Sequence, residues 1–314
     1  MMRPRAVDYD LLVLGEINVD LIVNGEDLVP VFGQELLVDD VTLTMGSSSV
    51  IFACGAARLG HRVGFVGVVG DDELGYFMLR EMRARGVDVS SVIVDPAIKT
   101  GITVSLSTPS DRAMLTYAGA IAALRADQVD PRLLDRARHL HVSSYFLQDG
   151  LRPGLPALLA SARARGLTTS LDPGFDPHET WDSGLHEALR HVDVFLPNEV
   201  EGPAIAGTAD TGSALETLAT RVPVVALKLG AQGAVARRGA EVERATPPPV
   251  RVVDTTGAGD SFDAGFIYGY LAGWPLAQTV RLACACGALA TRLPGGTNGQ
   301  PTLEEALAAV GPTA

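Results

Sequence analysis

Apolar residues occur along the chain in short runs that alternate with amphipathic stretches. The first run, residues 11–14, is continuous and ends at Gly15, which is typical of a strand buried on both faces of a parallel sheet. A helix over 49–59, a second buried strand over 63–69 and an amphipathic helix over 74–85 are predicted next. Further strands, each after a helical segment, are predicted at 139–142, 167–171, 192–196 and 224–229. This order predicts an α/β fold with a doubly wound, mostly parallel sheet flanked by helices.

Two segments depart from this alternation. Residues 19–44 have the pattern of short strands and turns, and residues 100–116 alternate apolar and polar positions like a half-exposed antiparallel strand. Both leave the predicted core near strand ends, where ligands bind in open α/β sheets. We therefore expect a small β-sheet lid over the site, with an inert flap as the alternative. Without an internal repeat or a linker, residues 1–314 are expected to form a single domain.

Composition narrows the function classes. The chain has 314 residues, 47% of them hydrophobic, with a formal net charge of −12. An acidic surface without a basic cluster disfavours nucleic acid as a partner. Its three cysteines, in apolar surroundings, favour buried thiols in a reducing compartment. With neither a signal core nor a run long enough to span a membrane, the protein is expected to be cytoplasmic and not membrane-bound.

Two common nucleotide-binding motifs are missing. A P-loop needs GxxxxGK[ST], and neither Lys99 nor Lys228 stands in that context. A dinucleotide-binding fingerprint needs GxGxxG soon after the first strand, and Gly15-Glu-Ile17 does not supply it. Hydride transfer is therefore a disfavoured function.

The segment 254–265, DTTGAGDSFDAG, places glycines and acids directly ahead of an apolar helix. Gly257 and Gly259 allow backbone N–H groups to turn toward one point at a helix N-terminus, where donors and dipole favour an anion. Such an anion hole suits the charge that develops in phosphoryl transfer. Asp260, expected to be kept ionised by the same dipole, is a candidate general base. The alternative is a glycine-containing cap whose first-turn acid complements the dipole.

This segment resembles the C-terminal signature of the ribokinase-like (PfkB) carbohydrate kinases. The resemblance covers nearly the whole chain, because four further motifs are similar to family motifs in the same order. They are Gly15-Glu-Ile-Asn-Val-Asp20, the first signature over residues 46–60 and 66–75, Pro197-Asn-Glu-Val-Glu201, and residues 228–234, KLGAQGA. It implies a ribokinase-like kinase that uses ATP to phosphorylate a hydroxyl, preferably primary, of a sugar or sugar derivative.

The resemblance also implies catalytic and nucleotide-binding roles. Asp260 would deprotonate the sugar hydroxyl, and the N–H groups of Gly257, Ala258 and Gly259 would form the anion hole. ATP and Mg²⁺ would be the cofactors, with the triphosphate and the metal ordered, largely through water, by Asn198 and Glu201. The ATP site would be lined by Lys228, Gly230 and Gly233. As alternatives from the residues alone, Asn198 and Glu201 could cap a helix, and Lys228 could extend to an edge.

Other roles implied by the resemblance concern the sugar, a second cation and assembly. Asn18, Asp20 and Gly46 would face the sugar, although Asp20 alone could be a turn residue. Asp254 and Thr256 match positions that in many members help to hold a monovalent cation such as K⁺. Relatives often pair through their lid sheets, so a homodimer is expected.

The first signature departs from the family. Members that phosphorylate ribose-like sugars commonly have GGKGxN, whereas residues 46–51 are GSSSVI. Ser47 stands at the second glycine and Ile51 at the asparagine, which argues against a simple copy of ribose recognition. A nucleoside kinase with Ile51 against a base, and a catalytically silent ligand sensor, are the alternatives. Further substrate-facing candidates, with core packing as the alternative, are His141, Ser144, Tyr145 and Gln148.

Overall fold

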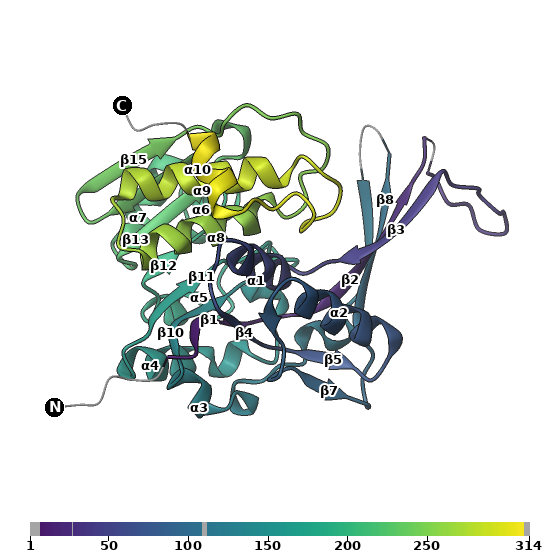
Figure 1. Cartoon of the computed structure of the whole chain (residues 1–314), viewed down its shortest axis with the longest axis horizontal. Coiled ribbons are helices and arrows are strands. Elements are labelled where there is room, and N and C mark those ends of the chain that lie inside the picture. The colour runs from purple at the N-terminus through teal and green to yellow at the C-terminus, as the bar shows by residue number, and fades with distance from the viewer. Residues whose placement is uncertain (1–6, 27, 109–111, 311–314) are drawn as a thin grey trace.

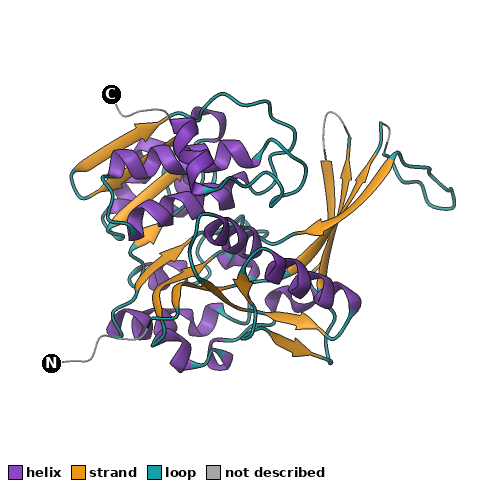
Figure 2. Cartoon of the chain, in the orientation of Figure 1, coloured by secondary structure: helices purple, strands orange, loops and turns teal. Residues whose placement is uncertain are grey.

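A computed structural model describes residues 7–26, 28–108 and 112–310 of the chain. Its main sheet has nine strands: β1 (Tyr9–Leu14), β4 (Val63–Val66), β6 (Val87–Asp88), β10 (Ala137–Val142), β11 (Thr168–Leu171), β12 (Val194–Phe195), β13 (Val224–Lys228), β14 (Ala234–Arg238) and β15 (Glu241–Ala245). Their order is β15-β14-β13-β12-β11-β10-β1-β4-β6. All pairs from β6 to β13 are parallel, and β14 and β15 add an antiparallel edge. The predicted doubly wound sheet is confirmed, as the central strands in Figures 1 and 2 show.

Helices cover both faces of this sheet (Figure 2). One face packs on α1 (Ser48–Arg58), α2 (Glu73–Ala84), α8 (Ala258–Leu271), α9 (Leu276–Ala290) and α10 (Leu303–Val310). The other packs on α3 (Pro131–Leu134), α4 (Leu155–Ala164), α5 (Leu185–Leu189), α6 (Glu201–Ala206) and α7 (Thr211–Ala219). Leu11 and Val13 enter the first core and Leu12 and Leu14 the second, which explains why residues 11–14 of β1 are continuously apolar. None of the helices formed by the described residues has the length and apolarity to cross a membrane.

The predicted strand over 63–69 is interrupted at Gly67. It divides into β4 and β5 (Val68–Gly70), and β5 pairs with β7 (Ile93–Asp95) in a separate two-stranded sheet. A Cβ at Gly67 would lie 2.7 Å from the carbonyl oxygen of Gly15, so the chain passes too close to β1 for any side chain. Short 3₁₀ helices connect other elements at Gly119–Ala122, Ala126–Gln128, Tyr145–Leu147, Arg152–Gly154 and Gly230–Gln232.

A second sheet is formed by the two segments that interrupt the alternation. Its strands are β2 (Asn18–Asn24), β3 (Asp40–Met45), β8 (Gly101–Ser107) and β9 (Arg112–Tyr117), in the order β3-β2-β8-β9. Figure 1 shows this lid sheet projecting from the body on the side away from β13 and β15. The predicted small sheet is therefore present.

The lid sheet has one apolar face and one mainly polar face. Because directly opposed residues share a face, the register places Leu21 beside Leu43 and Val104, and Val104 beside Leu115. The apolar face comprises Val19, Leu21, Val23, Val41, Leu43, Met45, Ile102, Val104, Leu106, Ala113, Leu115 and Tyr117. At its rim Leu43 and Leu115 are 43% and 63% exposed, so this apolar face is not fully covered within one chain.

Candidate active site

Several polar residues lie close together where parallel strands of the main sheet end. Glu16 follows β1, Ser144 follows β10, Asp172 follows β11, Asn198 follows β12, and Lys228 is the last residue of β13. The N-terminus of α8 reaches the same edge, because a Cβ at Gly259 would lie 3.7 Å from the Lys228 Nζ. The carboxyl edge of the sheet is where open α/β folds bind ligands.

Gly257 makes the turn into α8 with φ 74° and ψ 5°, a left-handed conformation that favours glycine. A Cβ at this position would lie 2.7 Å from both Cα and O of Gly296. The helix that follows is 14 residues long, so its N-terminus is a suitable anion site. The N–H of Ala258 donates to Thr255 O at 3.2 Å. This hydrogen bond occupies the same N–H that is predicted to donate to an anion.

Asp254 anchors the glycine turn. Its Oδ1 accepts the N–H of Thr256 at 2.9 Å, and its Oδ2 accepts the N–H of Gly295 at 2.8 Å. The backbone N–H of Asp254 donates to Thr291 O at 3.1 Å. The predicted cation-holding pair, Asp254 and Thr256, is thus fixed beside residues 291–296.

Asp260 lies in the first turn of α8. Burial, together with the charge of Asp172, raises the pKa of Asp260 to about 8, against the opposing effects of Lys228 and a hydrogen bond with Ser48. The expectation that the helix dipole keeps this carboxyl ionised is therefore not met near neutral pH. A half-buried acid with a pKa near neutrality is well matched to proton transfer.

A buried ion network lies beside Asp260. The Lys228 Nζ lies 2.5 Å from Asp172 Oδ2 and 3.1 Å from Asp263 Oδ2. Although burial alone would raise it, the ammonium holds the pKa of Asp172 below its usual value, while burial raises the pKa of Asp263 well above its own. The Lys228 side chain is 12% exposed, so it does not extend to an outer edge. Sequence reasoning missed both aspartates, although Asp263 stands one helical turn after Asp260.

The three candidate sugar residues converge. Asn18 Nδ2 donates to Asp20 Oδ1 at 3.0 Å, and the N–H of Gly46 donates to Asn18 O at 3.0 Å. A Cβ at Gly46 would overlap the side chains of both Asn18 and Asp20. Glycine at position 46 is therefore required by the close approach of this polar corner.

Glu16 is a further buried residue that sequence reasoning missed. Its Oε1 accepts the hydroxyls of Ser47 and Ser144, both at 3.0 Å, and its Oε2 accepts the hydroxyl of Ser49 at 2.5 Å. Ser47 and Ser144 both have positive φ, 73° and 50°. The carboxyl thus holds two strained serines from distant segments. The φ of Ser47 also explains why glycine suits the second position of the signature.

Ile51 packs under the glycine turn. The side chain is 3% exposed, its Cγ2 lies 2.9 Å from where a Cβ at Gly257 would be, and its Cδ1 occupies the space beside Gly296. Its carbonyl accepts Gln300 Nε2 at 2.8 Å. We therefore attribute to Ile51 a role in supporting the glycine turn at Gly257.

Replacing Ile51 with asparagine, the residue common in the family, is expected to lower the free energy of unfolding by about 2–5 kcal/mol, the range for losing a buried aliphatic side chain. We expect kcat to fall with it and no activity on ribose to appear. Ile51→Val should cost only about 0.5–1.5 kcal/mol. Thermal unfolding and ribose assays measure both, and a stable, ribose-active Ile51→Asn enzyme would contradict the packing role.

On the nucleotide side, Asn198 and Glu201 cap each other. Asn198 Oδ1 accepts the N–H groups of Val200 and Glu201 at 2.8 and 2.9 Å, and Glu201 Oε2 accepts the N–H of Asn198 at 2.9 Å. These reciprocal hydrogen bonds are those expected from the alternative in which the two residues cap a helix. Burial and the charge of Asp172 raise the pKa of Glu201 to about 7. These are oxygen donors of the kind that Mg²⁺ prefers, so capping and metal binding through water are compatible.

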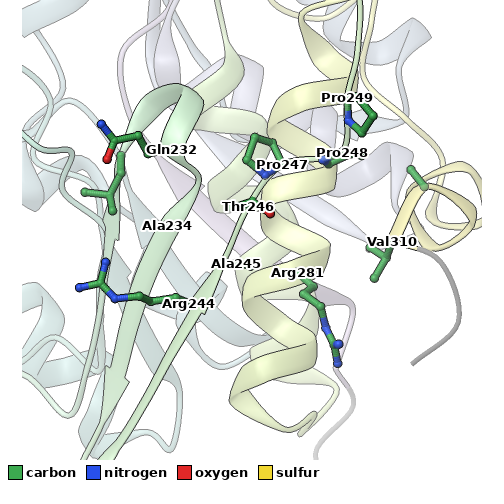
Figure 3. Close-up of a pocket in the computed structure, with 12 residues that line it drawn as sticks. Gln232, Ala234, Arg244, Ala245, Thr246, Pro247, Pro248, Pro249, Arg281 and Val310 are labelled. Atoms are coloured by element: carbon green, nitrogen blue, oxygen red, sulfur yellow. The ribbon is translucent and has the colours of Figure 1, made fainter. Parts of the chain in front are cut away.

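A cavity of about 600 Å³ adjoins the two glycines predicted for the ATP site. Gly230 and Gly233 have φ of 54° and 90°, and a Cβ at Gly233 would overlap Ala245 O. This turn contributes Leu229 and Gln232 to the cavity wall, and Figure 3 shows Pro247, Pro248 and Arg281 among the residues that line the rest of it. The remaining lining residues are Ala234, Arg244, Ala245, Thr246, Pro247, Pro248, Pro249, Arg281, Ala309 and Val310.

The weaker substrate candidates are engaged in core contacts. His141 bonds Ser170 and Ser143, both at 2.7 Å, and burial lowers its pKa to about 3. Tyr145 OH donates to Ser183 O at 3.0 Å, and Gln148 Nε2 to Ser143 O at 2.5 Å. Of this group only Ser144 contacts a residue of the site, Glu16.

The chain is similar to known proteins over most of its length. The model of the pfkB family carbohydrate kinases matches residues 8–303. The chain is 32% identical over 311 residues to the 2-dehydro-3-deoxygluconokinase of Bacillus subtilis, covering 92% of this chain and 94% of that protein. It is 33% identical over 305 residues to a fructokinase of Klebsiella pneumoniae, covering 92% and 95%.

A solved structure supports the fold and the cofactors used in the family. An E. coli protein in complex with ATP and Mg²⁺ superimposes with a TM-score of 0.85 at 26% identity, covering 96% of this chain and 98% of that chain. The fold is therefore ribokinase-like, and the enzyme is a carbohydrate kinase. Since the family model spans almost the entire sequence, the chain belongs to the pfkB family of carbohydrate kinases.

Proposed function

We propose that this kinase transfers the γ-phosphoryl group of ATP to a primary hydroxyl of a sugar or sugar derivative, with Asp260 as general base. The observation that carries the proposal is the position of Asp260, a half-buried carboxyl with a raised pKa that directly follows the Gly257–Gly259 turn at the N-terminus of α8. In the reaction the sugar hydroxyl gives its proton to Asp260. Its oxygen then forms a bond to the γ-phosphorus while the bond from that phosphorus to the β,γ-bridging oxygen breaks.

The backbone around Gly257 and Gly259 supplies the anion hole in this proposal. Backbone N–H groups at a helix N-terminus stabilise the negative charge on the phosphoryl oxygens. The Ala258 N–H takes part once its bond to Thr255 opens. The turn itself is held by Asp254 and supported from below by Ile51.

ATP is proposed to lie along the turn that contains Gly230 and Gly233, with its base in the adjoining cavity. Asn198 and Glu201 would hold Mg²⁺ through water, and the bound metal would neutralise phosphate charge. Asp254 and Thr256 are proposed to hold a monovalent cation with residues 291–296. A comparison of kcat in K⁺ and Na⁺ tests that assignment. Use of ATP fits the proposed cytoplasmic location.

The sugar is proposed to bind at Asn18, Asp20 and Gly46, because a carboxylate and an amide suit paired hydroxyls. A panel of fructose, 2-dehydro-3-deoxygluconate, ribose and nucleosides, read by ADP release, tests this proposal. Phosphorylation of a sugar or sugar acid supports it, phosphorylation of nucleosides alone supports the nucleoside-kinase alternative, and ligand binding without ADP release supports a silent sensor.

The lid sheet is proposed to cover the substrate with its polar face and to pair with a second copy of the chain through its apolar face. Asn18 and Asp20 belong to the polar face, so that face adjoins the proposed sugar-binding site. Two apolar sheet faces pack well on each other, and a second copy supplies a matching one. Substrate should then protect residues 19–44 and 100–116 from proteolysis.

Two neighbouring residues test the dimer. Leu115 and Met114 are 63% and 62% exposed but lie on opposite faces of β9. Leu115→Glu is expected to convert the protein to monomer, because the charge would enter the apolar interface, while Met114→Glu leaves the dimer intact. Analytical ultracentrifugation measures both variants. A wild-type monomer, or dissociation in both variants, would contradict pairing through this face.

A further inference from the structure

Lys228 holds an unusual position for a lysine. It ends β13 at the carboxyl edge of the sheet, and its side chain is 12% exposed between Asp172, which is 8% exposed, and Asp263, which is 1% exposed. Nζ contacts Asp172 Oδ2 at 2.5 Å and both oxygens of Asp263 at 3.1 and 3.2 Å. Burying an ammonium with two carboxylates costs desolvation free energy, and apolar residues of similar volume often stabilise a core as well or better. Stability alone therefore does not explain why these three charged side chains are buried together, and we consider a functional role for them.

The network lies directly against the glycine turn. A Cβ at Gly259 would lie 3.7 Å from the Lys228 Nζ and 3.8 Å from its Cδ, so ammonium and backbone are separated by the space that glycine leaves open. Asp263 lies four residues after Gly259 on α8, hence on the same helix face. Strand β13 and helix α8 together place the Lys228 ammonium at the edge of the proposed anion hole.

A transferred phosphoryl group brings negative charge to the turn, and a cation fixed in a desolvated site stabilises such charge far more than one in water. We propose that Lys228 is a catalytic residue that contacts the transferred phosphoryl group, and that Asp172 and Asp263 are positioning residues that hold its ammonium beside Gly259. The assignment depends on the proposed function, and it adds to that function a cation that contacts the γ-phosphate.

A pair of variants separates catalysis from packing. Lys228→Met is expected to lower kcat by about 100-fold, as when one stabilising donor to the transition state is lost, and to lower Tm because it leaves two acids unpaired. Lys228→Met combined with Asp263→Asn should recover much of the Tm but none of the kcat. Recovery of kcat together with Tm would overturn the proposal, because it would make the network purely structural.

Nucleotide affinity gives a second readout that does not depend on turnover. If Lys228 contacts the γ-phosphate, Lys228→Met weakens ATP binding about tenfold more than ADP binding, whereas an equal loss for both nucleotides would overturn the assignment. Asp263→Asn keeps the Lys228–Asp172 pair and should fold; we expect it to lower kcat about tenfold with an unchanged KM for the sugar. An unchanged kcat would remove Asp263 from the positioning role.

Failure of this proposal is distinguishable from failure of the proposed function. If the wild-type enzyme phosphorylates a sugar and Asp260→Asn does not, while Lys228→Met retains full activity, only the role of Lys228 is wrong. If the wild-type enzyme phosphorylates nothing in the panel, the proposed function itself is wrong.

Discussion

Asp260→Asn is expected to lower kcat by about 10²–10⁴-fold, the usual contribution of a general base. Asparagine has nearly the same size and fits the first turn of α8, but it cannot accept a proton from the sugar hydroxyl. ATP binding should be kept, because the glycine turn, Lys228 and the cavity are unchanged. Steady-state assays with the sugar identified by the panel measure kcat, and a fluorescent ATP analogue measures binding.

A matched control is available at another helix. Glu73 is an exposed acid in the first turn of α2, so Glu73→Gln removes the same charge at the same kind of position away from the site. Its kcat should stay within twofold of the wild type. If Asp260→Asn were to retain near wild-type turnover, Asp260 would not be the base.

The pH dependence of the wild type should follow from the same carboxyl. Because burial raises the pKa of Asp260 to about 8, most of the free enzyme carries a protonated, inactive base below that pH. The value of kcat/KM, which reports the free enzyme, should therefore rise with pH and level off above about pH 8. This rise should be absent from the residual activity of Asp260→Asn, and an activity maximum at low pH would contradict the assignment.

The fold could be predicted because its signals are local. A strand buried on both faces must be apolar throughout, and β1 shows that pattern in four consecutive residues before Gly15. The half-exposed lid strand β8 alternates instead, and this alternation correctly marks it as part of a separate sheet. The pattern of apolar residues does not show in which direction neighbouring strands pair, or with which strand. It therefore did not predict that β14 and β15 form an antiparallel edge, or that β5 leaves the main sheet at Gly67.

Candidate site residues could be named from the sequence where a motif is contiguous, and were missed where contacts are made in three dimensions. The glycine turn and Asp260 lie within one segment, and Asn18, Asp20 and Gly46 meet because β2 pairs with β3. Lys228 is 56 residues from Asp172 and 35 from Asp263, so no spacing rule links them. Glu16 is likewise 128 residues from Ser144. The signature aligns Ile51 with a sugar-binding asparagine of the family, whereas packing places it under Gly257, a contact that only the fold could reveal.

The two glycines of the turn should respond differently to alanine. Gly257→Ala is expected to lower kcat by about 10²–10³-fold, comparable to the loss of an anion-hole donor. Its φ of 74° disfavours any side chain, and the new Cβ would lie 2.7 Å from the backbone of Gly296, so the turn must move. Gly259 lies inside α8, and its new Cβ would meet only the Lys228 side chain, at 3.7 Å or more.

Gly259→Ala is therefore the matched control, with the same substitution two residues away. We expect its kcat to fall less than tenfold and its Tm to be unchanged or slightly higher, because alanine favours a helix over glycine by about 1 kcal/mol. Kinetic assays measure kcat and thermal unfolding measures Tm for both variants. If both lose activity equally, crowding near Lys228 and not the backbone of Gly257 would dominate. If Gly257→Ala keeps its kcat, the geometry of this turn does not set the anion hole, and the stabilising charge must come from side chains such as Lys228.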